Sequence, residues 1–259
     1  MTPAERPENP FAATGVGTQY ALGRPYHHPR ALARALELLG ETRIGRALDV
    51  ACGTGMSTTA LREIADLAVG VDRSSEMLAI AARQHAGVLL RSAAETLPFL
   101  SGSFDAVTVS SGVHWFDQPR FFAEARRLLR RGGWIALYDH YFIGEMIDVP
   151  DFPEWARIAL DRYPLPPRNP QVGDPRAETP AGFESVAEDF FADDIDMTQQ
   201  QFVDYQLSIS NFVAAGERGV PRDELRSWLF ESTSSFYAGV DIRTVRFLAS
   251  VICLRVAPQ

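Results

Sequence analysis

The strongest constraint on the fold is a short apolar strand that runs directly into a glycine turn and then into a helix. The strand covers residues 46–52, Gly53-Thr-Gly55 follows at once, and a helix-permissive stretch runs from Ser57 to Ala65. A glycine turn at the carboxyl end of a strand lets backbone N–H groups approach a ligand at a helix N-terminus. The alternative is an ordinary tight turn between a strand and a helix, and this motif favours ligand binding over it.

Strands and helices alternate through the first half of the chain. The apolar pattern predicts further strands at residues 67–71, 88–91, 104–109, 134–138 and 245–256. It predicts helices at residues 30–39, 74–83, 120–129 and 155–162, and Gly40 is the stop signal for the first of them. Alternating strands and helices build an α/β fold, a doubly wound and mostly parallel sheet with helices on both faces.

The alternation stops after Asp139, and eight of the 17 prolines fall between Pro150 and Pro180. We interpret residues 1–259 as a single domain. It would consist of a ligand-binding core at 44–140, an inserted lid or cap at 141–185, and C-terminal helices with a closing strand at 186–259. No strand is assigned between residues 139 and 245. Thr198-Gln-Gln-Gln201 predicts a capping box for one helix carrying Phe202 through Phe212, and Pro221 begins another.

Composition narrows the class of partner. The net charge is -8, all 25 basic residues are arginine, and they form no basic block, so a nucleic-acid partner is not expected. No long apolar run and no signal-peptide core occur, which predicts a cytoplasmic protein without a membrane segment. Cys52 and Cys253 lack the spacing of zinc sites, so neither a metal site nor a disulfide is indicated.

Asp72 ends the second predicted strand and is the first candidate for binding a ligand through its side chain. A carboxylate at this point, after a glycine turn on the neighbouring strand, can accept hydrogen bonds from both ribose hydroxyls of an adenosine-type ligand. The alternative role is a helix-capping aspartate before Ser74 and Ser75. The combination with the glycine turn favours the ribose contact.

Four segments in order resemble the motifs of small-molecule class I S-adenosylmethionine-dependent methyltransferases. They are Leu48–Gly55, Val69–Asp72, Ala94–Phe99 and Gly102–Asp105. His114-Trp-Phe-Asp117 is similar to a signature of the branch that includes trans-aconitate methyltransferases. The resemblance, which covers about residues 44–138, implies a Rossmann-like seven-stranded sheet, S-adenosylmethionine as methyl donor, and a small-molecule acceptor. Members of the family methylate acids, hydroxyls, amines and carbons, and a carboxylate or a hydroxyl is the acceptor group that we consider first.

The resemblance also implies roles for individual residues. Gly53, Thr54 and Gly55 would line the methionine and ribose end of the donor, Asp72 would bind ribose, and Glu95 would reach the adenine edge. The full donor-binding set that it implies is Tyr20, Arg24, Asp49, Ala51, Gly53, Thr54, Gly55, Asp72, Arg73, Met77, Ala94, Glu95 and Ser110. Two positions depart from the family pattern: Ala51 stands at its first glycine, and Ala93 stands where many members carry an aspartate.

Two histidines are candidate bases, and each has an aromatic neighbour that is a candidate wall of the substrate pocket. His114 and Trp115 follow the fourth predicted strand, while His140 and Tyr141 follow the fifth, both at the ligand side of such a sheet. Methyl transfer is an in-line displacement, so a carboxylate acceptor needs no base, whereas a hydroxyl would benefit from one. Packing within loops is the alternative role for both histidines.

Two other functions remain open at this level. A nicotinamide-dependent dehydrogenase also places an acidic residue after a glycine turn, but its fingerprint expects a glycine near Met56, and none is present. A methyltransferase-like binding or scaffold protein without turnover is suggested by Ala51 and Ala93. The sequence does not indicate the oligomeric state or the identity of the acceptor.

Overall fold

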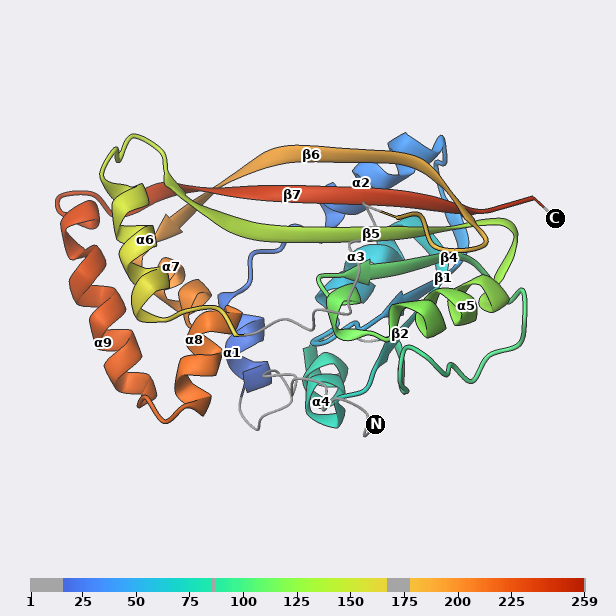
Figure 1. The fold of residues 1–259 in the computed structure, drawn as a ribbon, viewed down its shortest axis with the longest axis horizontal. Helices are drawn as coiled ribbons and strands as arrows, with labels where there is room; N and C mark the ends of the chain where they lie inside the picture. Colours follow the sequence, from blue (N-terminus) through green and yellow to red (C-terminus); the bar gives the residue numbers. More distant parts are fainter. Residues whose placement is uncertain (1–15, 85–86, 167–177, 259) are drawn as a thin grey trace. The chain divides into compact units, whose positions relative to one another are not determined.

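A computed structural model of the chain describes residues 16–84, 87–166 and 178–258, and it confirms the predicted α/β class. Its sheet has seven strands in the order β3-β2-β1-β4-β5-β7-β6 (Figure 1). Their bounds are Ile44–Val50 (β1), Ala65–Asp72 (β2), Val88–Arg91 (β3), Phe104–Ser110 (β4), Leu129–Met146 (β5), Phe183–Thr198 (β6) and Ile242–Val256 (β7).

Strand direction agrees with a mostly parallel sheet. Strand β1 pairs in parallel with β2 and β4, β2 pairs in parallel with β3, and β4 pairs in parallel with β5. Strand β7 lies between β5 and β6 and runs in the opposite direction to both (Figure 1). Because the first five strands are parallel, their carboxyl ends meet along one edge of the sheet.

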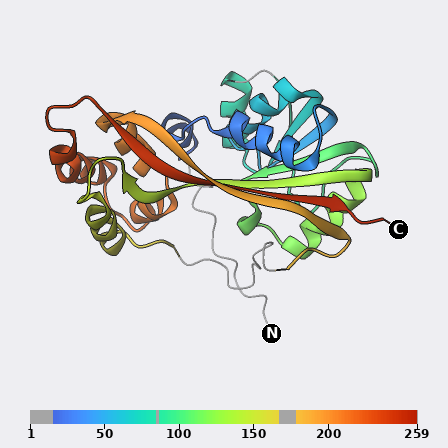
Figure 2. The same cartoon turned by 90° about the horizontal axis from the view of Figure 1, so that it is seen from above.

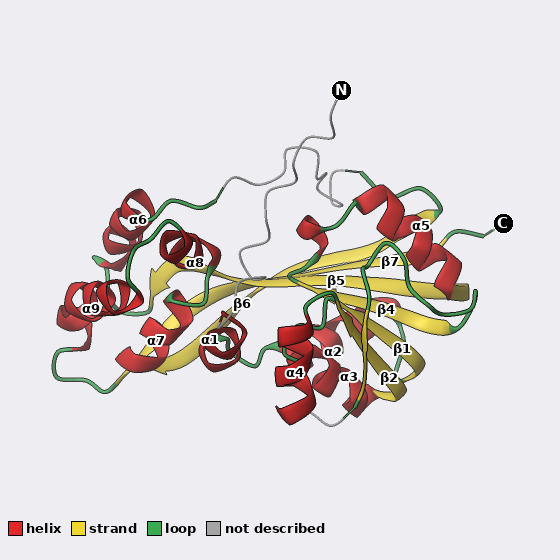
Figure 3. Ribbon diagram, turned by 90° about the horizontal axis from the view of Figure 1, so that it is seen from below, coloured by secondary structure: helices red, strands yellow, loops and turns green. Residues whose placement is uncertain are grey.

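Helices cover both faces of the parallel part of the sheet. Helices α2, α3 and α4 lie on one face and α5 lies on the other, as the views from above and below show (Figures 2 and 3). The helices are α1 (Val16–Gly23), α2 (His28–Leu39), α3 (Met56–Ile64), α4 (Ser75–Gln84), α5 (Gln118–Leu128), α6 (Phe152–Arg162), α7 (Gln199–Gln206), α8 (Ser210–Glu217) and α9 (Arg222–Thr233), with short 3-10 turns at Val113–Trp115 and Ser234–Tyr237. Gly40 ends α2 in the left-handed conformation, as predicted. None of the helices in the described residues combines the length and apolar character needed to cross a bilayer.

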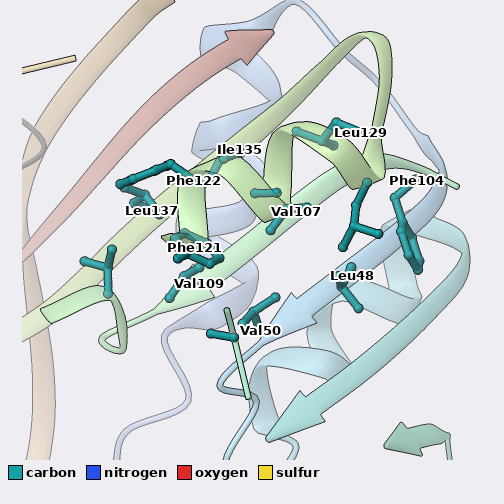
Figure 4. Close-up of a cluster of buried hydrophobic side chains, with 14 of the residues drawn as sticks. Leu48, Val50, Phe104, Val107, Val109, Phe121, Phe122, Leu129, Ile135 and Leu137 are labelled. Carbon is teal, nitrogen blue, oxygen red and sulfur yellow. The ribbon is translucent and has the colours of Figure 1, made fainter. Parts of the chain in front are cut away.

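The two faces of the sheet bury alternate residues of each strand. Along β5, Trp134 and Ala136 pack with α2 and α3, whereas Ile135 and Leu137 pack with α5 (Figure 4). Successive side chains of a strand point to opposite faces, so a sheet covered on both faces needs a continuous apolar run. This is why the central strands read as unbroken apolar segments rather than as alternating ones.

The chain divides into two compact units. Unit 1 comprises Met1–Pro25, Tyr141–Arg168 and Ala192–Leu248, and unit 2 comprises Tyr26–His140, Asn169–Phe191 and Ala249–Gln259. Unit 2 holds the parallel strands with α2 to α5, while unit 1 holds α1 and α6 to α9 around an aromatic cluster that includes Phe152, Trp155 and Phe202. The division into a core, a cap and a C-terminal part remains a prediction, and residues 167–177 of that cap lie outside the described residues.

The structure differs at two points from the prediction for the second half of the chain. Residues 183–198 form strand β6, which the sequence analysis did not predict, and β5 continues past Tyr138 to Met146. Acidic residues are depleted in strands, and β6 carries many of them, but it is an edge strand in which half of the residues are exposed and only three are buried. An exposed edge strand has no apolar alternation strong enough to be recognised.

The predicted capping box is confirmed, but the helix behind it is shorter than predicted. Thr198 Oγ1 accepts a hydrogen bond from Gln201 N at 3.2 Å, and Gln201 Oε1 accepts one from Thr198 N at 2.8 Å. Instead of one helix reaching Phe212, α7 ends at Gln206 and α8 begins at Ser210. Both helices bury apolar side chains, so the periodicity alone did not reveal the break.

Candidate functional site

The turn between β1 and α3 has the backbone conformation that glycine favours. Ala51, Gly53 and Gly55 have φ angles of 59°, 54° and 84°, all in the left-handed region. Gly55 is also the N-cap residue of α3, and its N–H donates to Cys52 O at 2.9 Å. Glycine adopts this region freely, whereas a residue with a Cβ pays a steric cost. Ala51, which departs from the family pattern, therefore holds a conformation that suits the glycine it replaces.

Asp72 lies beside this turn and binds it directly. One carboxylate oxygen accepts a hydrogen bond from Gly53 N at 2.9 Å and the other accepts one from Ser74 N at 2.8 Å. The side chain is 9% exposed, and burial raises its pKa while the two backbone N–H groups oppose the rise. The helix-cap role that competed for Asp72 belongs to Ser74, whose Oγ accepts from Met77 N at 3.2 Å. Each carboxylate oxygen has a further lone pair for a hydroxyl donor.

Asp49 is fully buried beneath the same turn. Its carboxylate accepts hydrogen bonds from three hydroxyl groups, those of Ser57 and Thr58 on α3 at 2.6 Å each and that of Thr108 on β4 at 3.2 Å. Burial, the largest effect, raises its pKa to about 6, and the three hydrogen bonds oppose that rise. The sequence pattern did not predict these three hydroxyl partners, although two of them follow the turn closely. With no exposed surface, Asp49 acts on the turn by joining β1, α3 and β4.

Substitution of Asp49 by asparagine should change how stability depends on pH. The folded-state pKa of about 6 exceeds the usual 3.8, so the folded chain holds this proton more tightly than the unfolded chain does. That contribution is fully present below pH 3.8 and is lost as the pH rises through about 6. The Asp49→Asn variant lacks it, so relative to wild type the variant should gain roughly 1 kcal/mol between pH 5 and pH 8 in urea unfolding. Asp66→Asn, on the exposed part of β2, is the matched control; a difference that stays constant with pH for Asp49→Asn would contradict the assignment.

The loop after β3 reaches the segment that precedes α5. Glu95 Oε1 accepts a hydrogen bond from Asp117 N at 2.8 Å. Asp117 is the N-cap residue of α5, and its side chain accepts from Arg120 N. Ala94 and Met77 are buried, while Ala93 is exposed and forms a β-bridge with Thr96. The structure thus brings Glu95 to the end of the segment His114–Asp117.

A second tight turn follows β4. Ser110 pairs with Tyr138 at the end of the β4–β5 ladder, and Ser111 has a φ angle of 51°. His114 and Trp115 then lie in the 3-10 turn, with ring centroids 4.8 Å apart. The ends of β1, β2 and β4 therefore carry most of the predicted donor residues along one edge of unit 2.

His140 lies in a cluster of histidine rings that the sequence analysis missed. Its ring is stacked on His27 at a centroid distance of 4.2 Å, and His27 packs against His28 at 4.3 Å. His28 Nδ1 is hydrogen-bonded to the hydroxyl of Tyr138 at 3.2 Å, and burial lowers the pKa of His28 well below its usual 6.5. Within the described residues, no group of three or more His, Cys, Asp or Glu side chains is arranged to hold a metal ion. Adjacent histidines near a helix start were the only signal in the sequence.

Three of the predicted site residues belong to unit 1. The guanidinium of Arg24 donates to Ser208 O at 3.0 Å, and its carbon lies 4.8 Å from the ring centroid of Tyr20. Tyr141 is 40% exposed on the part of β5 that belongs to this unit. The structure therefore brings Tyr20 and Arg24 together.

Comparison with known proteins is most informative for the part of the chain that carries the glycine turn. Residues 48–137 match the family model described as a methyltransferase domain. An uncharacterized methyltransferase of Mycobacterium tuberculosis is 36% identical over 138 residues, which are 53% of this chain and 55% of that protein. A demethylmenaquinone methyltransferase of Thermotoga maritima is 38% identical over 110 residues, 41% of this chain and 48% of that protein. The chain spans about half the length of the curated relatives it matches.

Solved structures extend the likeness beyond that segment. A proposed type II methyltransferase from Anaeromyxobacter dehalogenans has a TM-score of 0.68 at 23% identity, with 90% of this chain and 98% of that chain covered. At this identity the likeness concerns the fold. Residues 48–137 therefore match a methyltransferase domain, and over the rest of the chain the likeness to methyltransferases is one of fold.

Proposed function

We propose that the protein transfers a methyl group from S-adenosylmethionine to a small-molecule acceptor. The observation that carries this proposal is the Asp72 carboxylate held against the glycine turn by its hydrogen bond with Gly53 N. The donor is an adenosine derivative with two neighbouring ribose hydroxyls, and a buried carboxylate with free lone pairs suits both of them.

The residues of the turn fit the proposed donor sterically. A Cβ added at Gly53 would meet no atom of the described residues within 4 Å, so the space next to this backbone is open. Thr54 and Gly55 directly precede α3, and the backbone N–H groups in the first turn of a helix have no partner within the helix and favour a polar or negatively charged ligand atom. This arrangement supports a donor seated over the turn.

The remaining donor contacts are proposals that rest on the family resemblance. Buried Met77 and Ala94 would pack against the adenine, and Glu95 would contact its edge. Tyr20, Arg24, Arg73 and Ser110 complete the proposed set, and Asp49 contributes by holding the turn rather than by contact, since it is fully buried. Ala51 is compatible with the turn because it adopts the required backbone conformation.

Catalysis in this proposal consists mainly of alignment. The donor supplies an activated methyl group on a positively charged sulfur. The chain has to hold the acceptor atom in line with that methyl group and exclude water. Trp115 and Tyr141 are proposed walls of the acceptor pocket, and His114 and His140 are proposed bases for an acceptor that must lose a proton.

The proposal is tested by thermal unfolding with ligands. S-adenosylhomocysteine at a hundred times its dissociation constant should raise the free energy of unfolding by about 2.7 kcal/mol, and NAD should leave it unchanged. Incubation with S-adenosylmethionine and panels of carboxylic acids and alcohols, followed by mass spectrometry, then identifies the methylated group. Stabilisation without any turnover would favour a binding protein, and stabilisation by neither donor nor product would exclude the methyltransferase.

A further inference from the structure

Unit 1 buries four polar side-chain atoms to which no described residue forms a hydrogen bond. One is the hydroxyl of Tyr237, and the other three are Arg24 Nε, Gln206 Nε2 and Asn211 Oδ1. Gln206 is only 2% exposed and Asn211 only 5% exposed. Buried polar atoms are hydrogen-bonded in the great majority of cases, so a cluster that departs from this rule needs an explanation. A ligand that supplies the missing hydrogen bonds is one.

The three side chains come from neighbouring points of unit 1. Arg24 follows α1, Gln206 ends α7, and Asn211 lies in the first turn of α8. The hydrogen bond from Arg24 Nη2 to Ser208 O joins the end of α1 to the turn between α7 and α8.

Close packing of α1 on α7 holds Arg24 in this place. A Cβ added at Gly23 would collide with the backbone oxygen of Asp204 and would come within 3.0 Å of Ser208 Cβ. Only glycine permits this approach, so the guanidinium next to it is fixed against the turn that connects Gln206 to Asn211.

The cluster carries the positive charge of the Arg24 guanidinium. The Arg24 guanidinium lies between two aromatic rings, 4.8 Å from the centroid of Tyr20 and 5.5 Å from that of Tyr205. No carboxylate of the described residues forms an ion pair with it. The carboxylate of Asp204 on α7 pairs with Arg226 at 2.9 Å and accepts from Gln200 at 2.6 Å. A part-buried guanidinium in aromatic surroundings is a strong site for an anion.

We propose that Arg24, Gln206 and Asn211 form a subsite for a carboxylate. The guanidinium Nε and the amide nitrogen of Gln206 are both hydrogen-bond donors, and the two oxygens of a carboxylate are acceptors for such donors. The Asn211 carboxamide carries an oxygen acceptor and an NH2 donor. Rotation of the carboxamide by half a turn exchanges the two, so that the NH2 group faces the carboxylate. The subsite rests on the proposed function, which offers two sources of this group: the amino-acid end of the methyl donor and a carboxylic acid acceptor.

The test uses Gln206→Leu and Asn211→Leu, which remove the hydrogen-bonding atoms and suit a buried position. Gln200→Leu on the exposed side of α7 is the matched control. The probes are S-adenosylhomocysteine, methylthioadenosine, which lacks the amino-acid end, and a panel of small carboxylic acids with their amides. Without ligand, both variants should melt at the same temperature as wild type or higher. If a leucine variant melts at a lower temperature, the more conservative Gln206→Asn or Asn211→Ser takes its place.

Binding of at least one carboxylate probe should weaken roughly tenfold or more in both variants, as expected for loss of a hydrogen bond to a charged group. Weaker S-adenosylhomocysteine binding with unchanged methylthioadenosine binding assigns the subsite to the donor. Unchanged S-adenosylhomocysteine binding with loss of acid binding assigns it to the acceptor. Variants that bind every probe as wild type does overturn the proposal. Failure of wild type to bind either nucleoside would instead reject the proposed function, and the acid panel would still test the subsite.

Discussion

Replacing Asp72 by alanine is expected to weaken S-adenosylhomocysteine binding by roughly a hundredfold or more. Two hydrogen bonds from ribose hydroxyls to a carboxylate would be lost, and each bond to a charged group contributes about 1.5 to 3 kcal/mol. The side chain also holds the glycine turn, because its oxygens accept from Gly53 N and Ser74 N. The same change therefore removes a ligand contact and loosens the backbone that faces the ligand. Calorimetric titration of the folded variant measures the loss.

The control for this experiment is Asp66→Ala on the same strand. Asp66 is exposed and its only recorded ion pair among the described residues is with Arg43 at 2.7 Å, so its removal should leave binding unchanged. Melting curves establish that the Asp72 variant is folded, since alanine leaves two backbone N–H groups without an acceptor. Equal affinity of wild type and the folded Asp72→Ala protein would reject the ribose contact.

Replacing Gly112 by alanine should destabilise the fold by about 1 to 3 kcal/mol, the range for overpacking a well-packed interior. A Cβ at Gly112 would lie 2.9 Å from Ala51 Cβ and 3.3 Å from Val109 Cγ1. Its φ of -117° is open to any residue, so the cost is the collision and not backbone strain. Urea unfolding of the Gly112→Ala variant measures it.

Replacing Ala51 by glycine should have the opposite effect and should rescue the first change. It removes the Cβ that meets Gly112, and it relieves a left-handed conformation that costs a residue with a side chain about 1 to 2 kcal/mol. The Ala51→Gly variant should be more stable than wild type by about 1 kcal/mol. This value allows for the larger conformational entropy that glycine loses on folding. The double variant should then lose clearly less than the sum of the single effects.

A double-mutant cycle in urea measures the coupling between positions 51 and 112. Ala47→Gly is the matched control. Ala47 is buried on β1, the strand that leads into the turn, and its backbone lies outside the left-handed region, so this change should only destabilise the fold. Strictly additive effects at positions 51 and 112 would mean that the loop after β4 moves away from the added methyl group.

Local features of the site were predictable because neighbouring residues produce them. The glycine turn, the helix after it and the carboxylate at the end of β2 follow from backbone sterics and short-range hydrogen bonds, and the structure contains all three. The capping box at Thr198 and the end of α2 at Gly40 have the same origin. The resemblance to methyltransferases added the hypothesis that these features bind a methyl donor, whereas their geometry follows from the local sequence.

Contacts between distant segments were decided only by the tertiary structure. The hydroxyl partners of Asp49 come from both α3 and β4, and His140 is stacked on His27 from a far earlier segment. The edge strand β6 takes its conformation from pairing in the sheet and not from its own acidic sequence. Local propensity differs little between the possible conformations of such a segment. Packing and strand pairing with distant segments therefore select the conformation that forms. The sequence by itself therefore determined the α/β class, the turn and Asp72, while the packed chain decided what surrounds them.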